Sequence, residues 1–319
     1  MEMQRVPDAG YRIIGLPVAG FNRKNLLKNF SVLLKLRKSL NLAKKIVKEF
    51  KPDIAIGVGG YASGPTLKAA QKAGIPTLLQ EQNSYAGVTN KLLAKGAAKI
   101  CVAYPEMERF FPAEKIVETG NPVRKRLTER EISPSQGREE FGLDPARHTV
   151  LVVGGSLGAL SVNEAMEGCV KHLADAGIQV IWQSGKGFAS KASKAVEGLK
   201  GVLTMPFVTN MEAAYAAADL VVARAGAGTI SELELLGKPC ILVPSPNVAE
   251  DHQTKNANAL VKEGAAVMVK DDECREKLGG EIITLINDSK KLEEMSRAIR
   301  KLAYQESDER IADEIEKLL

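Results

Sequence analysis

The stretch Ala223-Arg224-Ala225-Gly226-Ala227-Gly228-Thr229-Ile230-Ser231-Glu232 marks a change from strand to helix. Residues 218–222 before it are mostly apolar and end in two β-branched valines, which is typical of a buried parallel strand, and residues 230–236 predict a helix. The two glycines let a ligand approach the backbone, and the first amides of the helix favour an anion. The stretch predicts either an ordinary turn or an anion site, with Glu232 one turn further on to accept hydrogen bonds from a diol such as ribose.

Length and composition restrict the class of protein. A chain of 319 residues suggests two domains, and 45% hydrophobic with 26% charged residues is ordinary for a soluble globular protein. The net charge of +5 is modest and there is one tryptophan, so a nucleic-acid partner is not indicated. Four separated cysteines and three scattered histidines predict reduced thiols, a cytoplasmic location and no metal site. The sequence has neither an apolar run of membrane-spanning length nor a signal core behind Met1.

The segment from Phe21 to Glu49 is strongly basic and has leucines at helical spacing. Such a helix either covers a sheet with its lysines in water or lies on an anionic membrane surface. Its single acid is Glu49, and its nine basic residues are Arg23, Lys24, Lys28, Lys35, Arg37, Lys38, Lys44, Lys45 and Lys48.

Strands and helices alternate along the chain, which predicts an α/β protein with parallel sheets and right-handed crossovers. The polar segment 133–147 predicts a linker and domain boundary near it, and the last forty residues are expected to be helical. The expected strands are 11–16, 53–58, 75–79, 99–103, 115–119, 148–153, 178–182, 202–205, 220–223, 239–243 and 265–269.

Glycine-rich turns follow several of these strands, at the sheet edge where α/β proteins bind ligands. The turn 154–159 is not GxGxxG and has no acid in a clear ribose position, which argues against an ordinary NAD site. A nucleotide diphosphate is an alternative ligand, with Arg124 and Arg224 as charge partners; each arginine also fits a surface ion pair. The polar loop 245–253 suits sugar hydroxyls. In it, Asp251 is a candidate N-cap, and His252 is either a base or a solvated side chain.

Taken in order, six motifs resemble those of the MurG family, the N-acetylglucosaminyltransferases that act on undecaprenyl-pyrophosphoryl-MurNAc-pentapeptide in peptidoglycan synthesis. Single motifs are weak, whereas the ordered set covers nearly the whole chain. The motifs are Gly59-Gly60-Tyr61-Ala62-Ser63-Gly64-Pro65, Glu81-Gln82-Asn83, Gly120-Asn121-Pro122-Val123-Arg124, Gly154-Gly155-Ser156-Leu157-Gly158-Ala159, Arg224 to Glu232, and Asp251-His252-Gln253.

The resemblance implies a GT-B fold, in which two Rossmann-like doubly wound parallel-sheet domains face each other across a cleft. Residues 1–124 would bind the lipid-linked acceptor, residues 125–302 would bind UDP-GlcNAc, and the C-terminal helix in 303–319 would pack back on the first domain. The family also begins with a glycine-rich, GGTGGH-like loop whose histidine is a candidate base. Here the opening resembles an internal family segment, so the first domain is expected to be incomplete and the general base is unassigned.

The resemblance also implies site residues. Glu232 would hold the ribose diol, and Val208 would contact uracil through its backbone. Gln253 would read the GlcNAc hydroxyls, and Asn83 would face the donor from across the cleft. The diphosphate would lie on Ser156 and on the turn Ala227-Gly228-Thr229, with Arg124 nearby. On the acceptor side, the implied residues are Gly60, Tyr61 and Glu81.

The implied reaction is an inverting transfer in which the acceptor's 4-hydroxyl attacks the anomeric carbon of GlcNAc and UDP leaves, with no cofactor and no essential metal. The protein would act at the cytoplasmic face of the plasma membrane, bound peripherally to its anionic surface. Three rival interpretations remain. They are a UDP-GlcNAc 2-epimerase of the same architecture, a non-catalytic UDP-sugar-binding protein, and a membrane-surface binding module.

Overall fold

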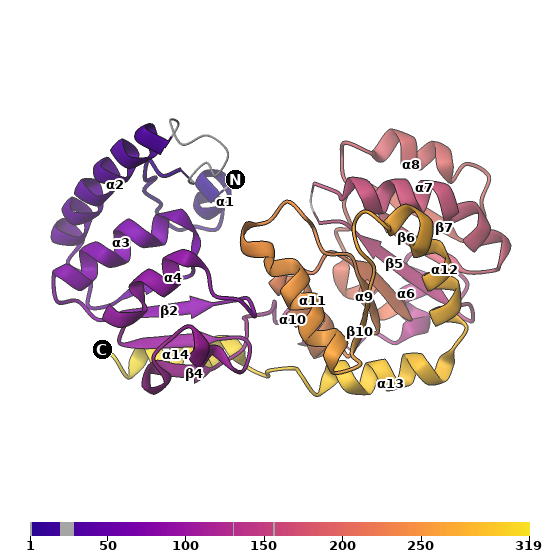
Figure 1. The fold of residues 1–319 in the computed structure, drawn as a ribbon. Helices are drawn as coiled ribbons and strands as arrows, with labels where there is room; N and C mark the ends of the chain where they lie inside the picture. Colours follow the sequence, from indigo (N-terminus) through magenta and orange to yellow (C-terminus); the bar gives the residue numbers. More distant parts are fainter. Residues whose placement is uncertain (1, 20–28, 130, 156) are drawn as a thin grey trace. The chain divides into compact units, whose positions relative to one another are not determined.

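A computed structural model describes residues 2–19, 29–129, 131–155 and 157–319, and the chain divides into two compact units (Figure 1). The first unit comprises residues up to 82 together with 86–119 and 309–319, and the second comprises 83–85 and 120–308. Each unit holds one parallel sheet, which confirms the predicted α/β fold with two parallel-sheet domains.

The sheet of the first unit has the order β1-β2-β3-β4 and is covered on both faces. On one face, Leu79 and Ile100 pack with Leu67 of α3 (Gly60–Lys72). On the other face, Leu78 contacts Ile311 of α14 (Ser307–Glu316), so the C-terminal segment completes the core of this unit. The strands are β1 (Ala55–Gly57), β2 (Thr77–Glu81), β3 (Lys99–Val102) and β4 (Ile116–Glu118).

Helix α2 (Asn29–Phe50) packs on α3 through Ala43, Val47 and Ala69. Upstream, α1 (Glu2–Asp8) precedes an irregular segment, so the strand predicted at 11–16 is wrong. That segment is attached to α2 instead of a sheet, because Ser39 Oγ donates to the Pro17 carbonyl at 3.0 Å. The remaining helices of the unit are α4 (Val88–Leu93) and the short 3₁₀ turns Ala94–Gly96, Met107–Arg109 and Ala113–Lys115.

The sheet of the second unit has six parallel strands in the order β10-β9-β8-β5-β6-β7. The order reverses between β5 and β8, and in doubly wound sheets the crevice beyond such a switch point is where ligands bind. The strands are β5 (Thr149–Val153), β6 (Gln179–Gln183), β7 (Val202–Met205), β8 (Leu220–Ala223), β9 (Cys240–Leu242) and β10 (Ala266–Met268).

Helices cover both faces of this sheet. The core on one face joins α7 and α12 through Met166 and Leu278 around Trp182, whose indole Nε1 donates to Asn163 at 3.0 Å. The helices are α5 (Arg126–Glu129), α6 (Pro134–Glu140), α7 (Leu160–Asp175), α8 (Ala189–Ala195), α9 (Met211–Ala217), α10 (Ala227–Leu236), the 3₁₀ turn Ala249–Asp251, α11 (His252–Lys262), α12 (Cys274–Ile286) and α13 (Ser289–Arg300).

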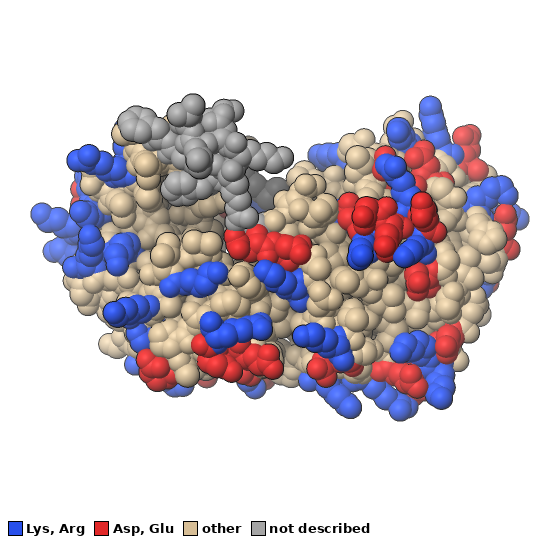
Figure 2. Space-filling model, in the orientation of Figure 1, with Lys and Arg blue, Asp and Glu red and all other residues tan. Residues whose placement is uncertain are grey.

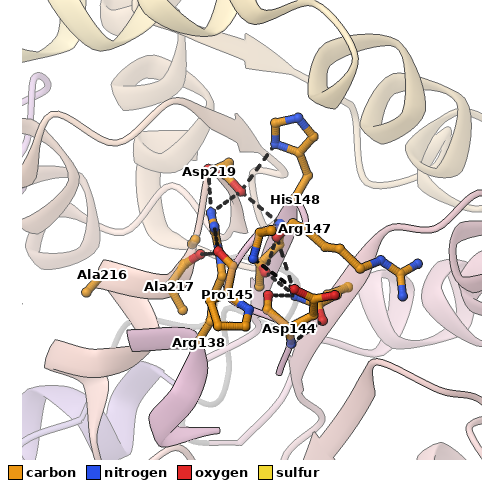
Figure 3. A network of polar contacts seen from close by, with 12 residues as sticks. Arg138, Asp144, Pro145, Arg147, His148, Ala216, Ala217 and Asp219 are labelled. Atoms are coloured by element: carbon orange, nitrogen blue, oxygen red, sulfur yellow. Dashed lines mark hydrogen bonds and ion pairs between the residues drawn. The ribbon is translucent and has the colours of Figure 1, made fainter. Parts of the chain in front are cut away.

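The polar segment 133–147 is not a linker, and the boundary predicted near it is wrong. Ser133 caps α6 in a capping box with Gln136, and Arg138 is buried and paired with Asp219 (Figure 3). The polar residues therefore serve a cap and an ion pair inside the second unit. Apart from the short excursion at 83–85, the chain instead passes between units at 119/120 and at 308/309.

Candidate active site

A cleft of about 840 Å³ opens in the second unit beyond the carboxyl ends of β5 and β8. Its walls come from the turn after β5, the turn after β8, and the loop after β9. Of the predicted donor-binding residues, four line the cleft directly: Arg124, Thr229, Glu232 and Gln253.

The turn after β8 presents a helix start to the cleft. Gly226 is the N-cap of α10, and Ala227, Gly228 and Thr229 form its first turn. The amides of a helix's first turn have no carbonyl partner within the helix and lie at the positive end of its dipole. Gly226 and Thr229 line the cleft, so this turn can hold an anionic group such as a phosphate.

The turn after β5 faces the same space and requires glycine. Gly155 and Gly158 have φ of 80° and 79°, and a Cβ at Gly158 would lie 2.4 Å from the Ser184 carbonyl oxygen. Gly155 and Leu157 both line the cleft. Ser156, the predicted phosphate ligand between them, lies outside the described residues.

Glu232 lies within the cleft with both carboxylate oxygens engaged. Its Oε1 is 3.1 Å from Arg124 Nη2, and its Oε2 accepts from the Tyr215 hydroxyl at 2.8 Å. Burial and the neighbouring Glu232 carboxylate raise the pKa of Tyr215 well above its usual value, so this hydroxyl stays a donor. Nothing in the sequence marks Tyr215 as a site residue, because it lies in α9 among alanines.

Arg224 was predicted as a charge partner for a diphosphate, but its guanidinium is hydrogen-bonded to groups of the protein itself. Its guanidinium donates to the carbonyl oxygens of Val243 and Pro244, to Asp271, and to Ser161 Oγ. These partners lie on separate elements around the cleft. Arg224 therefore braces the walls of the cleft, a role that the turn motif alone did not reveal.

The loop after β9 brings Gln253 to the cleft, where its Oε1 accepts from the Ser245 amide at 2.8 Å. Asp251 occupies the N-cap position of α11, as predicted, but its side chain makes no capping bond to the backbone. The residue has φ of 51°, and its carboxylate accepts from the Thr254 hydroxyl at 2.7 Å.

Asn83 and Val208 do not line the cleft, although each contacts an element that does. Asn83 Oδ1 accepts from the buried Asn256, whose side chain also donates to the Ala225 carbonyl beside the α10 turn. Val208 is buried beside Phe207, which lines the cleft, and its amide donates to Gln183.

The predicted acceptor residues all lie in the first unit. Gly60, with φ of 76°, and the exposed Tyr61 begin α3 directly after β1. Glu81 is buried at the end of β2, where its Oε2 accepts from the Gly87 amide and from Asn90 Nδ2, each at 2.9 Å. Glu81 thus fixes the start of α4.

Comparisons with known proteins agree with this architecture. The glycosyltransferase family 28 C-terminal domain matches residues 149–315, and the N-terminal domain of the same family matches residues 1–102. Proteins of Parabacteroides distasonis and Phocaeicola vulgatus are 56% and 59% identical to the chain. The matches cover all of it and 87% and 85% of their own lengths. Both are named UDP-N-acetylglucosamine–N-acetylmuramyl-(pentapeptide) pyrophosphoryl-undecaprenol N-acetylglucosamine transferase. The crystal structure of MurG from Acinetobacter baumannii superposes with a TM-score of 0.80 at 30% identity, covering 99% of this chain and 88% of that one.

Two parallel-sheet units, with a glycine-lined cleft at the switch point of the second, define a glycosyltransferase of family 28. Within that class, the chain belongs to the MurG family.

Proposed function

We propose that the protein transfers GlcNAc from UDP-GlcNAc to the 4-hydroxyl of MurNAc in undecaprenyl-pyrophosphoryl-MurNAc-pentapeptide, with inversion at the anomeric carbon. The names of relatives more than 50% identical over the whole chain support this donor and acceptor. One observation carries the assignment of the donor site: a helix start suited to phosphate and the carboxylate of Glu232, one turn further on, border the same cleft.

Different residues of the cleft bind different parts of the donor. The first-turn amides of α10 hold the diphosphate, and Glu232 holds the ribose diol. As the bond between GlcNAc and UDP breaks, negative charge grows on the diphosphate. Fixed amide dipoles stabilise that charge without reorganising, as oxyanion-hole donors do. Arg124 adds a cation at the mouth of the cleft, and Gln253 reads the sugar hydroxyls.

The test uses the full chain, UDP-GlcNAc and a lipid-linked MurNAc-pentapeptide acceptor. We expect a disaccharide product, and we expect Glu232→Ala to weaken UDP-GlcNAc binding by at least roughly tenfold in titration calorimetry. Glu263→Gln, at an exposed glutamate outside the cleft, is the matched control. UDP-GlcNAc binding without transfer would favour a non-catalytic binder, and formation of a 2-epimer would favour an epimerase. Unchanged affinity of the Glu232 variant would remove the donor-site assignment.

We further propose that α2 holds the protein against an anionic membrane surface. Lys and Arg side chains gather over α2, at the left of Figure 2. Leu33 and Leu34 are about half exposed on the same helix, while Val32, Ala43 and Val47 face its own unit. No helix among the described residues is long and apolar enough to cross a membrane.

Sedimentation with vesicles tests this attachment. Reversing the exposed charges of Lys44, Lys45 and Lys48 to Glu should weaken binding to vesicles containing phosphatidylglycerol by at least roughly tenfold, because each cation near such a surface is worth about 1 kcal/mol. Reversal of Lys194, Lys200 and Lys262, exposed lysines of the second unit, is the control. Equal losses in the two triple variants would count against α2.

A further inference from the structure

Asn121 attaches the segment that carries Arg124 to helix α10. Its Nδ2 donates to Ser231 Oγ at 3.1 Å, and the two residues are 5% and 8% exposed. Ser231 directly precedes Glu232 on α10, and Asn121 lies three positions before Arg124. The same two stretches of chain are therefore joined twice, by this buried bond and by the ion pair between Arg124 and Glu232 at the cleft.

Further contacts hold the backbone on either side of Arg124. Gly120 has φ of 78°, and a Cβ at this position would lie 2.3 Å from the Tyr304 Cβ, so the segment begins in close contact with another part of the second unit. After Arg124 comes the short helix α5, in which Leu127 is buried. Residues 120–129 are thus held at both ends, with Arg124 between them.

The two partners of the ion pair are supported differently. Glu232 lies inside α10, and its carboxylate also accepts from the Tyr215 hydroxyl. Arg124 lies in no helix or strand, and its side chain is 48% exposed. Where its guanidinium reaches therefore depends on where its backbone is held. The Asn121 bond is well suited to hold it, because a hydrogen bond in the interior is stronger than one exposed to water.

We propose that Asn121 is a positioning residue for the donor diphosphate: its bond to Ser231 holds Arg124 at the cleft, within reach of the phosphates. This inference rests on the proposed function, in which Arg124 supplies a cation at the mouth of the cleft. Asn121 itself does not line the cleft. It acts only through Arg124, so its effect on binding should vanish when the arginine is absent.

Calorimetric titration of the full chain with UDP and with uridine, which has no phosphate, tests this dependence. Asn121→Ala removes the donor of the buried bond, and Ser231→Ala removes its acceptor. Each variant is also combined with Arg124→Ala. The matched control is Thr149→Val, which keeps the size of the side chain but removes a buried hydroxyl that accepts from Gln179 at 3.0 Å. Thr149 begins β5, at the end of the strand away from the cleft.

Each variant of the buried bond should bind UDP about three- to tenfold more weakly, because the charge-assisted contact between Arg124 and phosphate is partly lost. Affinity for uridine should stay within about twofold of wild type, because Glu232 keeps its bond to Tyr215. In the Arg124→Ala background, the same variants should change UDP affinity by less than about twofold, since the contact through which they act is gone. Thr149→Val should lower thermal stability and leave both affinities unchanged.

Four results would overturn the inference: unchanged UDP affinity in the variants of the buried bond, an equal loss of UDP and uridine affinity, a loss that persists in the Arg124→Ala background, or the same loss in Thr149→Val. If Asn121→Ala does not fold, Ser231→Ala decides under the same criteria. Failure of the wild type to bind UDP, or full UDP affinity in Arg124→Ala alone, would instead contradict the proposed function, so the two failures are distinguishable.

Discussion

Arg124 Nη2 lies 3.1 Å from Glu232 Oε1, so the first cation after the unit boundary is paired with the acid proposed to hold ribose. The Arg124 side chain is 48% exposed, whereas that of Glu232 is 17% exposed. The arginine is thus the more exposed partner of the pair. Binding of a ribose diol to Glu232 would release Arg124 toward the diphosphate, and both groups would gain partners together.

Replacing Arg124 by Ala tests that exchange. We expect affinity for UDP to fall about tenfold, because a charge-assisted contact to phosphate is lost. Affinity for uridine, which has no phosphate, should stay the same or rise, because Glu232 no longer has to leave an ion pair. Titration with both ligands measures the difference, and Arg126→Ala is the control, since Arg126 pairs with Glu212 and does not line the cleft. Parallel losses for UDP and uridine would contradict the exchange.

Tyr215→Phe removes one hydroxyl from the support of Glu232. The variant should bind UDP-GlcNAc about three- to tenfold more weakly, because the carboxylate loses the 2.8 Å bond that orients it. Its free energy of unfolding should change by less than about 1.5 kcal/mol, the usual net value of one hydrogen bond. Calorimetry and urea unfolding on the same preparation separate the two effects. Loss of stability with full affinity would assign Tyr215 to packing alone.

Much of the sheet could be predicted from local pattern. The strands predicted at 202–205 and 220–223 correspond residue for residue to β7 and β8. For β8 the reason is clear, because a strand that is buried along its whole length needs a continuous apolar run. Helix α3 starts at Gly60, although the glycines and the proline of residues 59–65 are typical of a turn. The Ser63 and Thr66 hydroxyls bond back to the carbonyls of Gly59 and Ala62 in this first part of the helix.

Residues that act through distant partners were not predictable in this way. Asp219 and Arg138 are 81 positions apart, and Gln183 contacts residues 28 and 25 positions away. The residue types show that these side chains are polar. Their hydrogen-bond partners become apparent only when the sheet is assembled. Gln183 did carry one usable signal, a polar side chain at the carboxyl end of an apolar strand, where ligands of α/β sheets bind.

Arg138→Met tests the ion pair between Arg138 and Asp219, which lies in the segment that was predicted to be a linker. The guanidinium makes two 2.8 Å bonds to Asp219 and further bonds to the carbonyls of Ala217 and Pro145 (Figure 3). Its loss should lower the free energy of unfolding by about 2 kcal/mol, because the Asp219 carboxylate, 25% exposed, loses its charged partner while it still accepts from the Thr149 amide. Affinity for UDP-GlcNAc should not change, since Asp219 precedes β8 and the cleft follows it.

Urea unfolding measures the loss, with Arg147→Ala as the control, because Arg147 is exposed and the described bonds of its guanidinium go to the Gly177 carbonyl. An Arg138 variant of wild-type stability, or one that folds but binds the donor poorly, would contradict this account.

Glu234 provides a prediction about pH. It lies on α10 two residues after Glu232, is 8% exposed, and has a pKa raised by burial to about 8. The unfolded chain releases this proton near pH 4.5, whereas the folded chain retains it until about pH 8. The folded state therefore binds more protons between these values, and stability falls as pH rises through this window. Lys238, whose pKa burial lowers to about 8, acts in the opposite sense and only above that pH.

Glu234→Gln should remove this dependence, because the amide does not titrate. Between pH 5 and pH 8 the wild type should lose about 3 kcal/mol more stability than the variant, with the variant the more stable protein at pH 8. Urea unfolding at both pH values gives the difference. Glu263→Gln, at an exposed glutamate, should leave the wild-type slope intact. If the Glu234 variant follows the wild-type slope as well, Glu234 does not retain its proton in the folded protein, and burial does not raise its pKa as stated.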